Sequence, residues 1–176
     1  MSAMRWLRWF VALAAASLLC VQAHAGRSCE EKRPTATSVV RGLELADKTR
    51  MALDASGADV VVLARAGQDL TRWGLHYSHF GFAYRERDAQ GQVVWRVVHK
   101  LNQCGSAEAA LYRQGLGEFF LDDPWRYETA WVVPRRDVQD ALLPVLKDNT
   151  RAAAVHVKPY SIVSYAWGQR YQQSNQ

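Results

Sequence analysis

The pattern of apolar and polar positions divides the first half of the chain into short elements. Apolar side chains recur at helical spacing over residues 35–55, and Ser56-Gly57 follows as an end signal. The run Asp59 to Ala66 is rich in β-branched residues, which is typical of a buried strand. The pattern therefore predicts a helix that leads directly into a strand.

Two more apolar segments have the features of a β-hairpin. Residues 77–86 and 92–101 each favour a strand, and the segment between them is polar. Its loop, Ala89-Gln90-Gly91, ends in a glycine suited to the left-handed position of a bulged hairpin. We expect these two strands to pair antiparallel.

The rest of the chain alternates more loosely between helix and strand patterns. We expect a helical turn over 106–114, broken by Gly115-Leu116-Gly117, and a strand over 127–133. A helix should follow over 135–148, with Val138, Leu142 and Val145 on one face and a bend or early end at Pro144. The stretch over 151–176 should be irregular. This order predicts an α+β fold, with an N-terminal helix packed on a mostly antiparallel sheet. The polar ending after an aromatic-rich stretch leads us to expect a domain that is incomplete at its C-terminal end.

The first 25 residues have the three parts of a secretory signal peptide. Arg5 and Arg8 precede an apolar stretch from Phe10 to Val21, and Ala23-His24-Ala25 is a small-x-small cleavage site. The alternative, a membrane anchor, needs about 20 apolar residues. We expect cleavage after residue 25, a single domain over 26–176, a periplasmic or secreted location, and no membrane span afterwards.

Composition and charge narrow the function classes. The chain has 176 residues, 49% of them hydrophobic and 22% charged, which fits one globular domain. The formal charge is +5, and two of its arginines, Arg5 and Arg8, belong to the expected signal. The remaining charge is spread over many positions, so we expect no nucleic-acid partner.

Export changes the meaning of the cysteines. Cys20 would leave with the signal, whereas Cys29 and Cys104 would remain as an even pair in an oxidising compartment. We expect them to form a disulfide. In the alternative, Cys104 is a nucleophile, but no helix start beside it would favour the thiolate.

His79 is the residue that most suggests chemistry. It lies early on a predicted strand and is followed by Gly81, where a backbone or ligand can approach closely. One interpretation is a core histidine bonded to a neighbouring carbonyl, and the other is a general base. A three-residue hairpin loop would pair His79 with Leu101 and place His99 diagonally beside it as an orienting residue. A loop longer or shorter by one residue sends His99 to the other face.

Other catalytic motifs are absent from the sequence. It has no C-x-x-C, no H-E-x-x-H, no glycine-rich phosphate loop and no G-x-S-x-G. His76 and His79 are three positions apart and would point to opposite strand faces. We therefore expect neither a metal nor a cofactor. Asp122-Asp123, before Pro124, suits a turn and helix cap better than a catalytic dyad.

Three segments together resemble a known family. ADVVVLARAGQDLTRWGLHYSHFGFAYRE, GLGEFFLDDPWRYETAWVVP and YSIVSYAWGQRYQQSNQ, in that order, resemble an uncharacterised family of exported bacterial proteins (DUF 2145). The resemblance covers nearly all of residues 29–176. It implies export, but no activity, because none is established for the family.

A looser resemblance points to a reaction. A strand with D-V-V, a loop and then S-H-F-G-F is similar to the circularly permuted branch of NlpC-type papain-like cysteine hydrolases. The resemblance implies that His79 is the general base and that the nucleophilic Cys follows later, at the start of a helix, in a motif like R-Y-Q-N-C-N-Q-W. Here Ser174 stands at that position. We expect the His79 ring, on a central strand, to point toward the segment that carries Ser174.

Three functions remain open at this point. In the first, the protein is an envelope hydrolase or acyltransferase that acts on cell-wall peptide, amide or lipid ester bonds. In the second, it is an inactive relative that binds such a ligand, or an envelope protein, in the same cleft. In the third, it is a structural envelope protein. His79 favours the first two. Ser174 favours the inactive relative, because a site tuned for a thiolate rarely supports a hydroxyl nucleophile.

Overall fold

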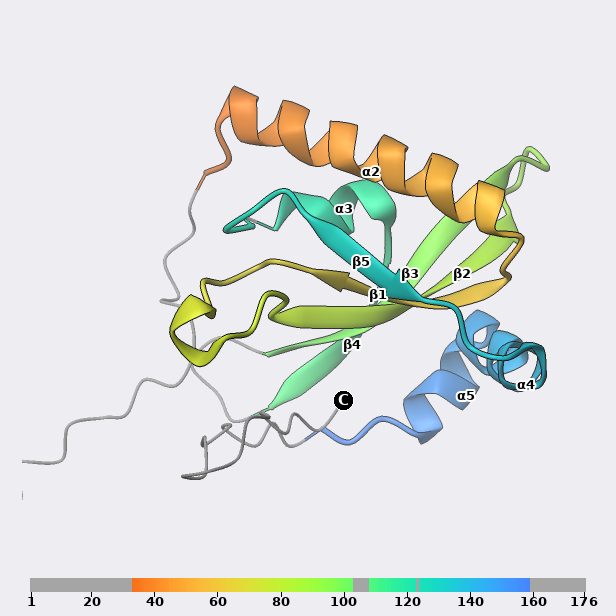
Figure 1. The fold of residues 1–176 in the computed structure, drawn as a ribbon. Helices are drawn as coiled ribbons and strands as arrows, with labels where there is room; N and C mark the ends of the chain where they lie inside the picture. The colour runs from red at the N-terminus through yellow and green to blue at the C-terminus, as the bar shows by residue number, and fades with distance from the viewer. Residues whose placement is uncertain (1–32, 103–107, 123, 159–176) are drawn as a thin grey trace, which may run out of the picture.

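The computed structural model describes residues 33–102, 108–122 and 124–158. Along the chain, the elements are α2 (Ala36–Ser56), β1 (Val60–Arg65), the 3₁₀ helix η1 (Thr71–Trp73), β2 (His79–Arg87), β3 (Val93–Asn102), β4 (Ala109–Gly115), α3 (Leu116–Leu121), β5 (Thr129–Val132), α4 (Arg136–Lys147) and α5 (Asn149–Ala154) (Figure 1).

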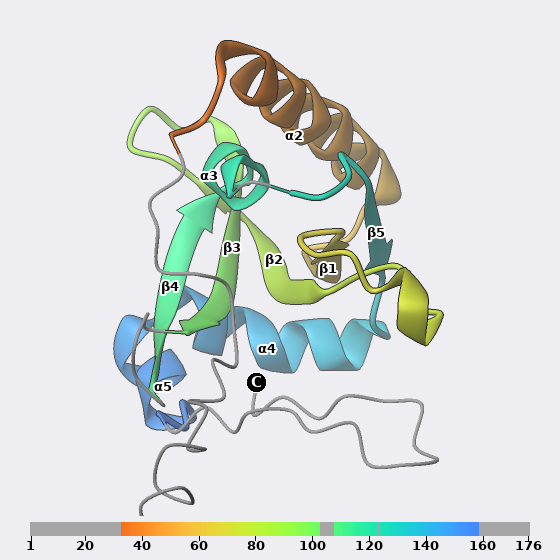
Figure 2. The ribbon, with the colours of Figure 1, turned by 90° about the vertical axis from the view of Figure 1, so that its left-hand side faces the viewer.

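The strands form one sheet with helices on both sides. The strand order is β4-β3-β2-β1-β5, so β2 is the central strand, and neighbouring strands pair antiparallel. Helices α2 and α3 lie on one face, while α4 and α5 lie on the other (Figure 2). The expected α+β fold, with an N-terminal helix on an antiparallel sheet, is confirmed.

Each face of the sheet has its own hydrophobic cluster. On the α2 side, the buried residues include Leu53, Val61, Leu63, Ala83, Trp95, Val97, Phe119 and Phe120. On the α4 side, they are Val60, Tyr84, Val98 and Leu146. Alternate residues along each strand serve opposite clusters, as the pleat of a strand requires.

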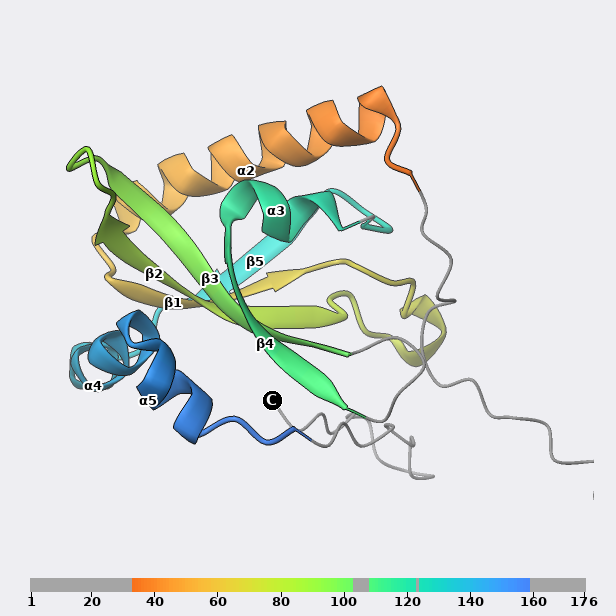
Figure 3. The ribbon, with the colours of Figure 1, turned by 180° about the vertical axis from the view of Figure 1, so that it is seen from behind.

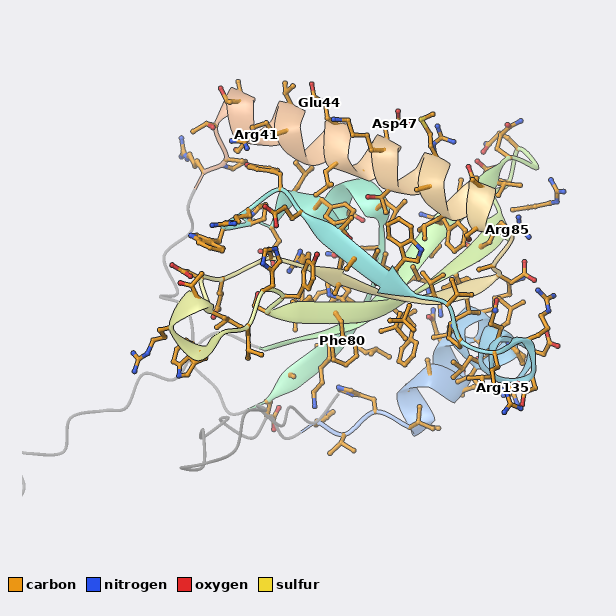
Figure 4. The ribbon with its side chains drawn as sticks, viewed as in Figure 1. Arg41, Glu44, Asp47, Phe80, Arg85 and Arg135 are labelled. Atoms are coloured by element: carbon orange, nitrogen blue, oxygen red, sulfur yellow. The ribbon has the colours of Figure 1, made fainter. Side chains whose placement is uncertain are left out.

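Helix α2 matches the predicted bounds because its end signals operate as expected. Thr35 is the N-cap, and its hydroxyl oxygen accepts a hydrogen bond from the Ser38 N–H at 3.1 Å. At the other end, Gly57 takes a left-handed φ of 69°, which suits a residue without a Cβ. Glu44 and Asp47 lie on the outer side of the helix, whereas the Arg41 guanidinium stacks 4.2 Å from the centroid of the Tyr127 ring (Figure 4).

The β2–β3 hairpin has the loop length that the sequence indicates. The Asp88 N–H donates to the Gln92 carbonyl at 3.0 Å, so residues 89–91 form the loop, and Gly91 has φ 76°. The register pairs Phe82 with Val98 and Arg87 with Val93. This loop length decides which β3 residues share a face with His79.

The segment that we expected to be a helical turn is a strand. Ala109–Gly115 pairs antiparallel with β3, and α3 follows immediately, with Gly115 as its N-cap (Figure 3). Its residues do not disfavour a helix, but strand pairing fills the edge of β3 and satisfies its backbone groups. The glycine therefore begins a helix instead of breaking one.

The predicted helix over 135–148 is confirmed by α4, but several details of the C-terminal region need correction. Helix α4 continues past Pro144 to Lys147, and its most buried residues are Gln139 and Leu146, whereas Val138 is 42% exposed. The buried stripe is therefore rotated from the one we expected. A further helix, α5, forms in part of the stretch predicted to be irregular.

The start of α5 has a clear cap. The Asp148 carboxylate accepts hydrogen bonds from the backbone N–H groups of Thr150 and Arg151. Among the described residues, no helix is both long and apolar enough to cross a membrane.

Candidate functional site

His79 begins the central strand β2 and lies directly across from Arg65 on β1. The chain enters the strand from an ordered turn. The Ser78 N–H donates to the Arg65 carbonyl at 3.2 Å, and the Ser78 hydroxyl accepts from the Gln68 N–H at 2.8 Å. The His79 side chain is half-buried, so it is held by the sheet and still reached by solvent. Phe80 alternates to the opposite face (Figure 4).

The side chains of His79 and His99 are hydrogen-bonded to each other. His79 Nε2 and His99 Nδ1 are 2.8 Å apart, and the rings meet edge to face, with centroids 5.1 Å apart. His99 is 3% exposed. The three-residue loop thus gives the register in which His99 shares a face with His79. The interpretation of His79 as a core histidine bonded to a carbonyl does not describe this contact.

Gln114 extends the contact to a third strand. His99 Nε2 and Gln114 Oε1 are 2.8 Å apart, and Gln114 pairs with Val97 in the β3–β4 register. The sequence pattern did not indicate Gln114, because 106–114 was predicted to be a helical turn. The segment Ala109–Gly115 offers no clear alternation, because Tyr112, Arg113 and Gln114 are consecutive polar residues, so only the pairing with β3 assigns Gln114 to the face of His99.

Gly81 makes room for the histidine pair. A Cβ on this residue would lie 2.8 Å from the Cβ of His99, 2.8 Å from Val97 Cγ1 and 2.9 Å from the Val98 carbonyl oxygen. The close approach that the sequence suggested at Gly81 is therefore made by side chains and backbone of β3. Only glycine fits without displacing them.

Arg65 and Phe119 form the wall of the site. The Arg65 guanidinium donates to the Phe119 carbonyl and to the Asp122 carboxylate, and it stacks 4.7 Å from the centroid of the Phe119 ring. That ring lies 5.9 Å from His79 and 5.2 Å from His99, between centroids. Nothing in the sequence pattern distinguished Arg65 from the other arginines. Asp122, interpreted as a cap feature, is the C-cap of α3.

Burial and the nearby cation keep both imidazoles neutral. Burial, followed by the charge of Arg65 and the proximity of His99, lowers the pKa of His79 to about 3. Burial also lowers the pKa of His99, against the hydrogen bond to Gln114, which favours the protonated ring. At neutral pH each ring therefore has one N–H donor and one lone pair. Such a pair can accept a proton, orient a ligand, or both.

Several predicted site residues are not part of this cluster. His76 instead pairs with Glu128 on the surface. Ser174, Cys29 and Cys104 lie outside the described residues, as do the expected signal peptide and Asp123. Within 33–102, 108–122 and 124–158, no group of three or more His, Cys, Asp or Glu side chains could hold a metal ion.

A cavity of about 530 Å³ lies at the other end of the hairpin, away from the histidines. It is lined by Arg85, Glu86, Arg87, Val93 and Lys147. Two of these side chains are in ion pairs, Arg85 with Asp59 and Glu86 with Arg96. We place the candidate site at His79 and His99 because that is where neutral, mutually bonded titratable groups meet.

Comparison with known proteins gives a family without an activity. The family model described as an uncharacterised protein conserved in bacteria (DUF2145) matches residues 52–176, and the chain belongs to this family. The match begins inside α2 and contains every residue of the cluster described above. Neither the curated proteins nor the solved structures include a match.

Proposed function

We propose that the protein is an exported cell-envelope protein with a papain-like, hydrolase-type cleft, in which His79 is the base and His99 its orienting partner. In this chain the cleft is catalytically inactive, because Ser174 occupies the position of the expected thiol. The observation that carries the proposal is the 2.8 Å contact between His79 Nε2 and His99 Nδ1 on the central strand. A base needs such a partner to fix its orientation.

The protonation state of the pair suits this role. Neutral His79 uses Nε2 in the contact with His99, and in the tautomer that donates from Nε2 its Nδ1 has the lone pair that can accept a proton from a nucleophile. A thiolate formed beside it would favour the charged ring through its own negative charge. A hydroxyl gives up its proton far less readily, which is the reason to propose an inactive site.

The direction of the chain after α5 is compatible with the proposal. The Lys158 carbonyl accepts a hydrogen bond from the Ala109 N–H at 2.9 Å, at the start of β4. That is the end of the sheet at which β2 begins with His79. A chain of residues 159–174 can extend about 50 Å, enough to reach any point of the site.

The test is to supply the missing thiol. In the Ser174→Cys variant of the full mature chain, we expect iodoacetamide to alkylate the introduced thiol at neutral pH at least about tenfold faster than in the Ser174→Cys/His79→Ala double variant. Peptide mass spectrometry would follow position 174 separately from the native cysteines. Ser174→Cys/His76→Ala is the matched control, because His76 is a surface histidine outside the pair. Equal rates in all three would refute the assignment of His79 as base.

The two other functions give different results in a companion assay. An active amidase, peptidase or acyltransferase would make the unmodified chain hydrolyse a thioester or peptide substrate, with loss of activity in His79→Ala. A structural or partner-binding envelope protein would show neither hydrolysis nor a His79-dependent thiol. We expect no hydrolysis by the unmodified chain.

Export is a separate part of the proposal. It rests on the n-region, the apolar stretch and the cleavage site within residues 1–25. Mass spectrometry of the periplasmic or secreted protein should find a mature N-terminus at Gly26, and one at Met1 would contradict export. Thiol titration of the denatured, unreduced protein should find Cys29 and Cys104 oxidised. On the chain-entropy model that bond would contribute about 3–5 kcal/mol.

A further inference from the structure

A continuous line of side-chain contacts crosses three neighbouring strands. It runs from Gln114 on β4 to His99 on β3 and on to His79 on β2, and both contacts are 2.8 Å long. Each contact is short enough for a hydrogen bond and therefore holds one proton between its two polar atoms. A ring that is neutral can donate from only one of its nitrogens. The proton position in one contact therefore decides the position in the next.

The amide of Gln114 fixes the sequence of donors and acceptors. Its Oε1 faces His99 Nε2, and because an amide oxygen only accepts, His99 must carry its proton on Nε2. His99 Nδ1 is then an acceptor, so the proton of the second contact belongs to His79 Nε2. The lone pair of His79 is left on Nδ1.

We propose that Gln114 is a positioning residue that acts through His99 to hold His79 in the Nε2–H tautomer, with Nδ1 as the atom that accepts the proton. The inference rests on the proposed function for the role of His79 as base. It adds Gln114, a residue on β4 that makes no contact with His79, and it assigns proton acceptance to one nitrogen of the His79 ring.

The surroundings of His99 favour this Gln114–His99–His79 relay. His99 is almost fully buried, and in the part of the chain that the structure describes its ring hydrogen-bonds only to Gln114 and His79. The neighbouring Phe119 ring offers no lone pair. The Arg65 cation disfavours a second proton on either imidazole, which would otherwise allow a ring to donate from both nitrogens.

The test compares an acceptor with a donor at position 114. Two-bond ¹H–¹⁵N correlation spectra of ¹⁵N-histidine-labelled mature protein at neutral pH report which nitrogen of each ring is protonated. We expect Nε2–H on His79 and His99 in the unmodified chain, where the Gln114 Oε1 can only accept. In Gln114→Lys, which can only donate, we expect both rings to change to Nδ1–H, although Gln114 makes no contact with His79.

Arg113→Met is the matched control. It alters the adjacent residue of β4, whose side chain lies on the opposite face of the sheet, against Tyr84 and the end of α4. We expect both tautomers to be unchanged in this variant. A general loosening of β4 would affect the two variants alike, whereas the relay responds only to Gln114→Lys.

The outcomes separate this inference from the proposed function. An Nδ1–H tautomer on either ring of the unmodified chain would overturn the relay, as would a His79 tautomer that is the same in the unmodified chain and in Gln114→Lys. If Gln114→Lys fails to fold, the unmodified chain decides the matter, since a scalar coupling across the His79–His99 contact must be present with the proton on His79. The expected tautomers could also be found while the alkylation rate of the Ser174→Cys thiol is unchanged by His79→Ala. That result would support the relay and refute the role of His79 as a base.

Discussion

The two faces of the sheet both bury polar side chains, but they use them differently. On the α4 face, Gln139 and Lys100 are 5% and 4% exposed, and the hydrogen bonds described for both end on backbone groups. On the α2 face, Arg65 also donates to a backbone carbonyl, but the two histidine contacts join side chains to side chains. Backbone partners fasten elements to one another, whereas a chain of imidazoles holds protons that can move.

Gln139 illustrates the first use. Its Oε1 accepts from the N–H groups of Asp59 and Val60 at 2.9 and 3.1 Å, and its Nε2 donates to the Pro134 carbonyl at 2.8 Å. The residue thus ties the first turn of α4 to the start of β1, and its amide has no titratable neighbour in these contacts. The comparison assigns stability to the α4 face and candidate chemistry to the α2 face.

The largest effect is expected from Gln139→Leu. The variant leaves the Asp59 and Val60 N–H groups without their acceptor, and an unsatisfied buried group costs about 1–3 kcal/mol. We expect the free energy of unfolding to fall by about 2–4 kcal/mol, measured by urea denaturation. The histidine tautomers should not change. A change of tautomer would show that the two faces are coupled and would break the comparison.

Gly81→Ala should damage the α2 face. The added methyl group would lie 2.8 Å from the His99 Cβ, and overpacking of this kind costs about 1–3 kcal/mol. We expect that loss of stability together with loss of the scalar coupling between His79 and His99. Gly117→Ala is the matched control, because its added Cβ meets only Leu43 Cδ2, at 3.4 Å. Retention of the coupling in Gly81→Ala would contradict the assigned role of this glycine.

The α2 face should also make the protein sensitive to acid. The folded-state pKa of His79 is about 3, below the value of about 6.5 for an unfolded histidine. The unfolded state therefore binds the proton first, so the stabilising contribution is complete above pH 6.5 and is lost as pH falls toward 3. Around the ring lie Arg65 from β1 and His99 from β3, with Asp122 paired to Arg65 after α3.

For His79 alone, the slope of the unfolding free energy should reach about 1.4 kcal/mol per pH unit in this window. Urea denaturation at a series of pH values measures it, and His79→Gln should lower the slope. His76→Gln is the control, since His76 lies on the surface beside Glu128. An unchanged slope in His79→Gln would show that the ring is not kept neutral by its surroundings.

The smallest effect is expected from Arg113→Met. Its guanidinium donates to the carbonyls of Leu146 and Lys147 at the end of α4, and the loss of such bonds costs about 1 kcal/mol. Urea denaturation should show this decrease, with the spectra of His79 and His99 unaltered. A decrease above about 3 kcal/mol would mean that the α4 face depends on this residue far more than its partners indicate.

The elements that the sequence predicts best are those whose signals are local. The spacing of apolar residues, Thr35, Gly57 and Gly91 define α2 and the hairpin without reference to other segments. The hairpin loop also determines the register, since a loop of fixed length leaves one way to align the strands. For a three-residue loop, the sequence therefore predicts that His79 and His99 lie side by side.

Other features depend on contacts between distant segments. The strand Ala109–Gly115 forms because β3 offers it an edge, and α4 presents Gln139 instead of Val138 because β1 needs a hydrogen-bond acceptor there. In both cases, the local sequence of the segment does not indicate the distant contact that determines its structure. Local propensities differ by less than about 1 kcal/mol per residue, so such tertiary contacts decide the outcome.

By itself, the sequence determined an α+β domain with a mostly antiparallel sheet, and it limited His99 to two positions, beside His79 or on the other face, depending on the length of the hairpin loop. Only the tertiary structure decided that Gln114 faces His99, that Arg65 stands across from His79, and that Phe119 covers both rings. Those three residues come from β4, β1 and α3. Their positions depend on the strand order and on helix packing. Both result from burial of apolar surface over the whole domain, so the residue type at a single position does not reveal them.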